Sequence, residues 1–476
     1  MDNIVIFGAS GGAIKVAQTF NDLGIEFECF VDNNEKKWGE QIFNKKINSP
    51  MYLTENTSKI VIASIYQEEI EKQLYDMGIS LDRIVPKEMY ILNYIKSHLK
   101  EFEKYICSKK ISNHSNSFYI FDLAEGMQIG GIESWSFNFM RILKEREEKC
   151  FAFSKVTTDE APTDLVDDVL QIDITYDSYL KSIINIIDEL VLRMPFTMVA
   201  NWMTQNFYAA YILKLLYPDQ VKIIAGVHHD MLAYYRRNKY IEDCVDAFLC
   251  VSSGSKKRML EEFEVNSSKV YYIPVPLKHM KIDDFVEQGV EEPLNICFGA
   301  RLEKAQKRAD YIIPLISKLE QNGVNYRFYI AGDGGYFSII QKYVLEHNLS
   351  DKIFLLGKIK SEKMFEFWTN KEIVLSLSDS EGMGLSILEA MACGVMPIVT
   401  DTAGIREFVV DDYNGYVVGF GDIDSIVSKI KQIEKNKKKM NQFRKNSLNI
   451  VKEKCIDDNY YNFLKRIGTR QKKKML

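Results

Sequence analysis

Two glutamates flank a glycine-containing turn in the last third of the chain, Glu381 before the turn and Glu389 after it. Glycine lets a backbone approach a ligand closely, and the free N–H groups at a helix start attract anions without a metal. We therefore expect the turn to hold a diphosphate, Glu389 to hydrogen-bond a ribose, and Glu381 to reach a group that is transferred. The turn consists of Gly382, Met383, Gly384 and Leu385.

A pair of basic residues, Arg301 and Lys307, follows the predicted strand Asn295 to Gly299. Two cations on one strand-end loop can neutralise the charge that builds on a leaving nucleoside diphosphate, which Mg²⁺ does elsewhere. The turns at residues 331–335 and 357–359 come after the next two predicted strands, and we expect these loops, including Ile359, to hold the base.

An earlier part of the chain offers residues for the opposite wall of a cleft. Gly130 and Gly131 precede a predicted helix, and His228 directly follows the predicted strand Lys222 to Val227. We expect the glycines to pass close to the ligand and the histidine to hydrogen-bond a sugar. Alternatively, the glycines form only a turn, His228 is satisfied by backbone groups, or His229 makes the contact instead.

Together these motifs resemble glycosyltransferase family 4, retaining enzymes with the two Rossmann-like domains called GT-B. The resemblance covers roughly residue 118 to the C-terminus and rests on the Glu381 and Glu389 spacing and on the basic pair Arg301 and Lys307. It implies sugar transfer on the front face of the donor, with the leaving phosphate taking the acceptor's proton. Glu381 would contact the donor sugar, and neither a metal nor another cofactor is expected.

One residue departs from the family pattern. The glycine that often follows the phosphate lysine is replaced by Arg308. We expect this arginine either to add positive charge or to point outward.

The start of the chain carries a different motif, with glycines at Gly8, Gly11 and Gly12 after a predicted strand. Residues 3–85 resemble the small Rossmann-like domain that precedes bacterial sugar acyltransferases, a domain associated with nucleotide-sugar binding. The glycines do not reproduce G-x-G-x-x-G, so a nicotinamide site is not expected there. A docking or regulatory role is the more cautious interpretation.

Strand-like and helical runs alternate almost throughout, which is typical of α/β domains with parallel sheets. At 476 residues the chain is too long for one core. We predict a GT-B architecture preceded by a small additional Rossmann-like domain. The expected units are an N-terminal domain at 1–92, a helical linker at 93–116, an acceptor-side domain at 117–290, a nucleotide-sugar-binding domain at 291–445, and a helical segment with a basic end at 446–476.

Charge and cysteine content indicate which binding partners and which cellular compartment to expect. A net charge of -5 argues against nucleic-acid binding, and eight cysteines without close pairs indicate neither a zinc site nor a disulfide scaffold. We find no leader or membrane-spanning run and expect a cytoplasmic protein. The basic runs Lys437 to Lys439 and Lys472 to Lys474 suggest surface charge or a peripheral membrane contact.

The sequence thus favours transfer from an NDP-sugar, UDP-sugar above others, to a saccharide, lipid-linked or protein acceptor, in surface polysaccharide or glycoconjugate synthesis. One alternative is an NAD-dependent sugar-nucleotide oxidoreductase or epimerase, and another is a non-catalytic nucleotide-sugar-binding assembly protein. Asp422 and Asp424 mimic a metal-binding D-x-D, but they begin a helical pattern, where aspartate is a common N-cap. No metal ligands are expected.

Overall fold

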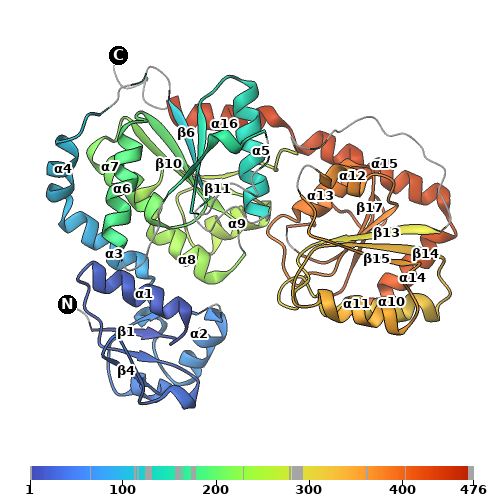
Figure 1. Ribbon diagram of the computed structural model, residues 1–476, viewed down its shortest axis with the longest axis horizontal. Helices are drawn as coiled ribbons and strands as arrows, with labels where there is room; N and C mark the ends of the chain where they lie inside the picture. Colours follow the sequence, from blue (N-terminus) through green and yellow to red (C-terminus); the bar gives the residue numbers. More distant parts are fainter. Residues whose placement is uncertain are drawn as a thin grey trace.

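The computed structural model contains three sheets, which follow one another along the chain (Figure 1). The residues that it describes are 3–64, 66–111, 114, 117–123, 131–155, 162, 164–172, 178–228, 230–277, 280, 293–360, 363–402 and 404–469. We call the parts built on these sheets the amino-terminal, central and carboxyl-terminal domains.

The amino-terminal domain has strand order β3-β4-β2-β1-β5 and is parallel except for the β3–β4 pair. Its strands are β1 (Ile4–Phe7), β2 (Cys29–Val31), β3 (Gln41–Ile42), β4 (Lys45–Asn48) and β5 (Lys59–Ile62). Helices α1 (Gly11–Asp22) and α2 (Gln67–Asp76) follow β1 and β5. The strand expected before Gly8 is β1, and its β-branched run is buried.

The central domain has a parallel sheet of order β12-β11-β10-β9-β6-β7-β8. The strands are β6 (Phe118–Leu123), β7 (Cys150–Ser154), β8 (Val169–Gln171), β9 (Phe196–Ala200), β10 (Val221–Val227), β11 (Ala247–Cys250) and β12 (Val270–Tyr272). The helices between them are α5 (Gly131–Glu145), α6 (Tyr179–Val191), α7 (Gln205–Leu216), α8 (Leu232–Tyr240) and α9 (Ser253–Glu261). Sequence reasoning had not placed β7 and β8.

The carboxyl-terminal domain has a second parallel sheet, of order β15-β14-β13-β16-β17-β18. Its strands are β13 (Leu294–Gly299), β14 (Tyr326–Ala331), β15 (Ile353–Gly357), β16 (Ile373–Ser376), β17 (Met396–Thr400) and β18 (Tyr416–Val418). The helices are α10 (Ile312–Gln321), α11 (Phe337–Glu346), α12 (Met364–Trp368), α13 (Leu385–Ala392), α14 (Ile423–Glu434) and α15 (Lys437–Lys454).

Two expected boundaries fall inside helices. The boundary after residue 92 lies within α3 (Lys87–Ser97), whose Ile91 and Ile95 are buried in the core of the central domain, ahead of α4 (Leu99–Cys107). The boundary after residue 445 lies within α15. An apolar stripe that continues along one helix face keeps each helix in one piece.

The last helix, α16 (Asp457–Thr469), returns to the central domain (Figure 1). The Tyr460 hydroxyl donates to the carbonyl oxygen of Ile273 at 2.7 Å, and its ring lies 4.1 Å from the ring of Phe139. Helix α16 therefore packs on the central domain, although it follows the carboxyl-terminal sheet in sequence.

Several smaller predictions can be compared with the structure. Asp422 is an N-cap, since its side chain accepts a hydrogen bond from the Ser425 backbone N–H at 3.0 Å. Within the described ranges no group of three or more histidine, cysteine or acidic residues is arranged to hold a metal, and no helix is long and apolar enough to cross a membrane. The cysteines are free thiols. Lys472 to Lys474 lie outside the described residues.

Candidate functional site

The turn before α13 is shaped by glycine. Gly384 is the N-cap of this helix and has a φ of 68°, in the left-handed region that glycine adopts without strain. A β-carbon there would also lie 2.4 Å from Cδ1 of Ile405. The loop after β16 can therefore turn sharply into α13, which leaves the first backbone N–H groups of the helix at the carboxyl edge of the sheet.

Lys307 and Glu381 form an ion pair at this edge. The Lys307 Nζ lies 2.7 Å from Glu381 Oε1, with side chains only 17% and 10% exposed. The Ser378 hydroxyl donates to the same carboxylate oxygen at 2.6 Å. Two of the residues selected from sequence are thus in direct contact, and their sheltered position strengthens the interaction relative to a surface pair.

Arg301 joins this pair through a residue that sequence reasoning missed. Its guanidinium donates to Gln306 Oε1 at 3.2 Å, and Gln306 Nε2 donates to the carbonyl oxygen of Ser380 at 3.2 Å. Gln306 also accepts a hydrogen bond from the Asp379 backbone N–H at 2.9 Å. The loop after β13 is therefore fastened to the loop before α13, so both predicted cations lie beside the glycine turn.

Glu389 is buried, at 5% exposure, in the interior of α13. The indole N–H of Trp368 donates to Glu389 Oε2 at 3.3 Å. Trp368 itself needs room at the end of β13, where a β-carbon on Gly299 would lie 2.5 Å from its Cη2 atom. The indole thus orients the second glutamate, and the sequence carried no spacing signal for this partner.

His228 lies at the end of β10, at 8% exposure. Its Nε2 atom is 2.9 Å from Asn201 Oδ1, and its ring meets Trp135 edge-on at 4.7 Å. The Asn201 amide donates in turn to the Asp122 carbonyl and the Ser136 hydroxyl, each at 2.9 Å. The imidazole is therefore held in one orientation, and Asn201 was not among the predicted residues.

The two halves of the site touch. A β-carbon at position 382 would lie 2.3 Å from the carbonyl oxygen of His228 and 3.6 Å from Cγ2 of Val251. One apolar core also runs through both domains and includes Met383 and Leu385. The glycine turn of one sheet therefore rests against the strand ends of the other.

Comparison with known families agrees with this arrangement. Residues 280–449 match the model of glycosyl transferases group 1, and residues 1–85 match that of the C2185-like, N-terminal domain. The match covers the carboxyl-terminal domain, which we therefore call the group 1 domain.

Similar curated proteins include N-acetyl-alpha-D-glucosaminyl L-malate synthase of Bacillus anthracis, 29% identical over 150 residues, or 32% of this chain and 39% of that protein. Another is the GtfA subunit of the UDP-N-acetylglucosamine peptide N-acetylglucosaminyltransferase of Streptococcus pneumoniae, 28% identical over 206 residues, or 42% of this chain and 39% of that protein. Both matches thus span well under two thirds of the relative's length.

Solved structures share the fold over nearly their whole length. Anabaena HepE in complex with UDP-glucose superposes with a TM-score of 0.61 at 14% identity, covering 73% of this chain and 98% of that one. Pneumococcal GtfA in complex with UDP and GlcNAc also gives 0.61 at 14% identity, covering 75% and 99%. The predicted GT-B architecture is confirmed.

Within the group 1 domain, the prediction for Arg308 needs correction. Its side chain neither points outward nor offers a free charge, because its guanidinium pairs with Asp310 and Asp379, each at 3.0 Å. Hydrogen bonding to Asp310 raises the pKa of Arg308 despite partial burial. Its φ of 50° is left-handed, which gives a physical reason for the glycine that is common at this position.

The other predicted residues are spread around this centre. Ile359 is half-buried and packs against the core shared by the group 1 and central domains. Gly131 is the first residue of α5, and a β-carbon there would meet nothing within 4 Å. Gly130 and His229 lie outside the described residues.

Proposed function

We propose that this chain is a retaining glycosyltransferase that moves a sugar from an NDP-sugar, with UDP-sugars favoured, to an acceptor without a metal ion. The observation that carries the proposal is the Lys307–Glu381 pair at 2.7 Å, beside the glycine turn that begins α13. Cations, helix N–H groups and a carboxylate are thereby gathered at one sheet edge, where α/β folds bind ligands.

Each residue has a role in this reaction. The diphosphate lies at the start of α13, with Lys307 and Arg301 neutralising the charge that develops as the bond from sugar to phosphate breaks. Glu389 accepts a hydrogen bond from the ribose. The acceptor oxygen attacks the anomeric carbon on the face that the phosphate leaves, and its proton passes to the departing phosphate oxygen.

The ion pair suggests how donor binding could free Glu381 to contact the sugar. A diphosphate carries more charge than one carboxylate, so it competes with Glu381 for the Lys307 ammonium. When the ammonium turns to the phosphate, the Glu381 carboxylate is left to accept hydrogen bonds from the donor sugar. Donor binding and placement of the sugar are then one event.

The similar proteins support the choice of donor class. The two solved structures are complexes with UDP-glucose and with UDP and GlcNAc, and the pneumococcal relative is named for a UDP-sugar donor. We extend this to a saccharide, lipid-linked or protein acceptor, to a role in surface polysaccharide or glycoconjugate synthesis, and to a cytoplasmic place with peripheral membrane contact.

The deciding experiment measures NDP release from a panel of UDP-, GDP- and ADP-sugars with EDTA present and mixed acceptors. Wild type should release one nucleotide despite EDTA, while Glu381→Ala and Lys307→Ala should lose about 10²- to 10³-fold in turnover. Lys304→Ala is the matched control, because Lys304 is exposed on the same loop. Release that EDTA abolishes, or full activity in Lys307→Ala, would contradict the proposal.

A nicotinamide-dependent reaction finds less support in the amino-terminal domain. Asp32, which follows β2, accepts a hydrogen bond from the Ala9 backbone N–H at 2.7 Å and pairs with Lys37 at 3.2 Å. A carboxylate in this place would hold the ribose of a dinucleotide, but here it fastens the glycine turn. Tight binding of NAD to the wild-type protein would restore the alternative, and absence of turnover with every donor would favour the non-catalytic one.

A further inference from the structure

Helices α6 and α8 of the central domain begin without a capping side chain of their own. The N-cap positions of α6 and α8 are Ser178 and Met231, and neither makes a side-chain capping hydrogen bond. Methionine has no suitable acceptor for this purpose. The first N–H groups of both helices therefore need a partner from elsewhere.

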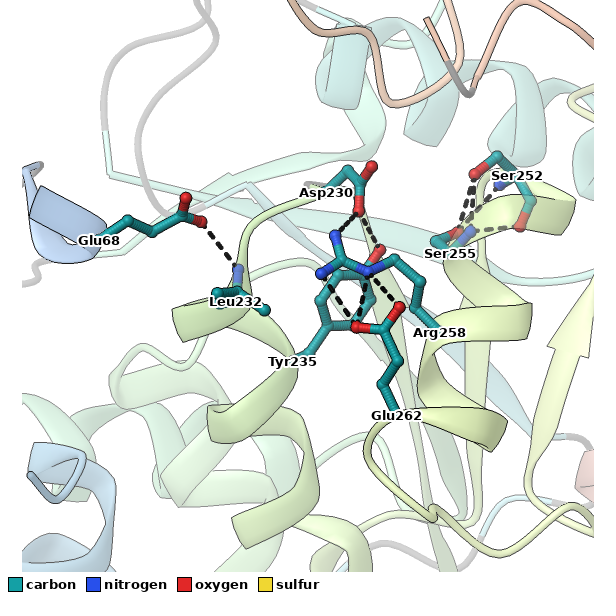
Figure 2. Close-up of polar contacts among 8 residues, drawn as sticks. All are labelled: Glu68, Asp230, Leu232, Tyr235, Ser252, Ser255, Arg258 and Glu262. Carbon is teal, nitrogen blue, oxygen red and sulfur yellow. Dashed lines mark hydrogen bonds and ion pairs between the residues drawn. The ribbon is translucent and has the colours of Figure 1, made fainter. Parts of the chain in front are cut away.

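The amino-terminal domain supplies that partner in both cases. Asp22, at the end of α1, accepts a hydrogen bond from the Leu180 backbone N–H at 2.7 Å. Glu68, in the first turn of α2, accepts one from the Leu232 backbone N–H at 3.2 Å, as Figure 2 shows. A carboxylate at a helix start is also favoured by the helix dipole.

A second contact reinforces the one at α8. Glu71 lies one helical turn after Glu68 and forms an ion pair with Arg236, one turn along α8 from Leu232. Its side chain is only 7% exposed. The α2–α8 contact thus fixes both the start and the rotation of α8 relative to the amino-terminal domain.

Helix α8 is tied to the candidate site on its other side. The Tyr234 hydroxyl donates to the carbonyl oxygen of Gly226, in β10, at 2.8 Å, and lies 3.4 Å from the carbonyl oxygen of Asn201. Asn201 is the residue that holds His228. A shift at the start of α8 would therefore reach the imidazole through two hydrogen-bonded residues.

Asp230, which precedes α8, is also held by a residue of α9. Arg258 donates to Asp230 Oδ1 at 2.5 Å, and the Tyr235 hydroxyl donates to the same oxygen at 2.9 Å (Figure 2). Hydrogen bonds with Glu262 and Asp230 raise the pKa of Arg258, although burial opposes this. Asp230 and Leu232 are thus fixed by separate partners.

We infer that Glu68 is a positioning residue: by capping α8 it holds the start of this helix, and through Tyr234 and Asn201 it keeps His228 in register with Gly382. The amino-terminal domain then forms part of the transferase site, and does not merely accompany it. This inference rests on the proposed function for its kinetic consequence. Its structural part, the dependence of α8 on Glu68, stands independently of turnover.

The test compares Glu68→Ala with Asp22→Ala. Both remove a carboxylate of the amino-terminal domain from a helix start, but Asp22 caps α6, which follows β8 at the far edge of the sheet from β10. We expect Glu68→Ala to lower kcat about three- to tenfold with donor KM unchanged, since the donor is held by the group 1 domain. Asp22→Ala should keep wild-type kcat, and Glu68→Gln, which retains an acceptor oxygen, should be intermediate.

Hydrogen–deuterium exchange provides a readout that does not need activity. Glu68→Ala should speed exchange in the first turn of α8 and in the peptide containing Asn201, whereas Asp22→Ala should speed it only at the start of α6. Unchanged exchange at α8, or equal kcat in the two alanine variants of an active enzyme, would overturn the inference. If wild type uses no NDP-sugar, the proposed function fails, and the exchange result alone decides the coupling.

Discussion

Gly382 rests directly on the carbonyl oxygen of His228, with room for a hydrogen atom and for nothing larger. A β-carbon at position 382 would lie 2.3 Å from that oxygen. The contact joins the glycine turn of the group 1 domain to the end of β10 in the central domain. The absence of a side chain at Gly382 therefore matters for two reasons. It allows close approach to a phosphate, and it allows the group 1 and central domains to pack in direct contact.

Gly382→Ala should therefore force the two domains apart or displace the turn. Overpacking of this kind costs about 1 to 3 kcal/mol, and we expect sugar transfer to fall by about tenfold or more. Steady-state kinetics with the donor that the NDP-release panel selects checks this. Gly11→Ala is the control, because a β-carbon there meets nothing within 4 Å. Wild-type kinetics in Gly382→Ala would show that the contact is not maintained during the reaction.

Arg308→Gly and Arg308→Ala separate backbone strain from charge. Both remove the ion pairs to Asp310 and Asp379, but only alanine keeps a β-carbon at a φ of 50°. The glycine variant should be the more stable of the two by about 1 kcal/mol. Chemical denaturation of both proteins measures the difference, and equal stabilities would contradict a strained backbone at this position.

Trp368→Phe should loosen Glu389 without disturbing the cations. It removes the hydrogen bond of 3.3 Å to Glu389 Oε2 while retaining an aromatic ring. If Glu389 binds the ribose, donor KM should rise about three- to tenfold with kcat little changed. Trp38→Phe is the matched control, since its indole N–H donates to the Asp32 carbonyl in the amino-terminal domain. An unaltered KM in Trp368→Phe would argue against this role.

Thiol reactivity should follow burial. Burial raises the pKa of Cys393 to about 12, with the Glu389 charge adding to it, and raises the pKa of Cys250 to about 12. At pH 8 a thiol with such a pKa is ionised in only about one molecule in 10⁴, and its thiolate fraction grows as pH rises toward 12. Iodoacetamide should therefore modify exposed Cys107 first. Mass spectrometry of the labelled native protein tests this order, with Cys107→Ser as the control. Labelling of Cys393 before Cys107 would contradict the prediction.

Much of the fold could be predicted because each strand carries its own apolar run. Strands β13 and β10 begin one residue before the expected Asn295 and Lys222 and end as expected at Gly299 and Val227, since their burial follows from local β-branched and aromatic sequence. The boundaries after residues 92 and 445 could not be placed, because α3 and α15 continue across them. A helix ends where its packing ends, and that depends on a partner distant in sequence.

The candidate site, too, has residues that the sequence could indicate and residues that it could not. Glu381, Glu389, Arg301 and Lys307 were predicted from residue type and spacing, and residues 280–449, which match the group 1 family, include all of them. Gln306 contacts Arg301, Trp368 contacts Glu389, and Asn201 contacts His228. These three residues carry no such signal, because a supporting side chain is recognised only from the residue that it hydrogen-bonds in the folded chain. Neither alternative for Arg308 included its pairing with Asp379, because Asp379 reaches it from another loop.

By itself, then, the sequence indicated where most strands lie, where the glycine turn before α13 lies, and which four charged residues are candidates for the site. These features depend on local chemistry. Only the tertiary structure decided which of them meet. Lys307 and Glu381 are separated by 74 positions, and Glu68 and Leu232 by 164. Contacts over such distances are fixed when separate sheets and domains pack together, and no local pattern of residues specifies that packing.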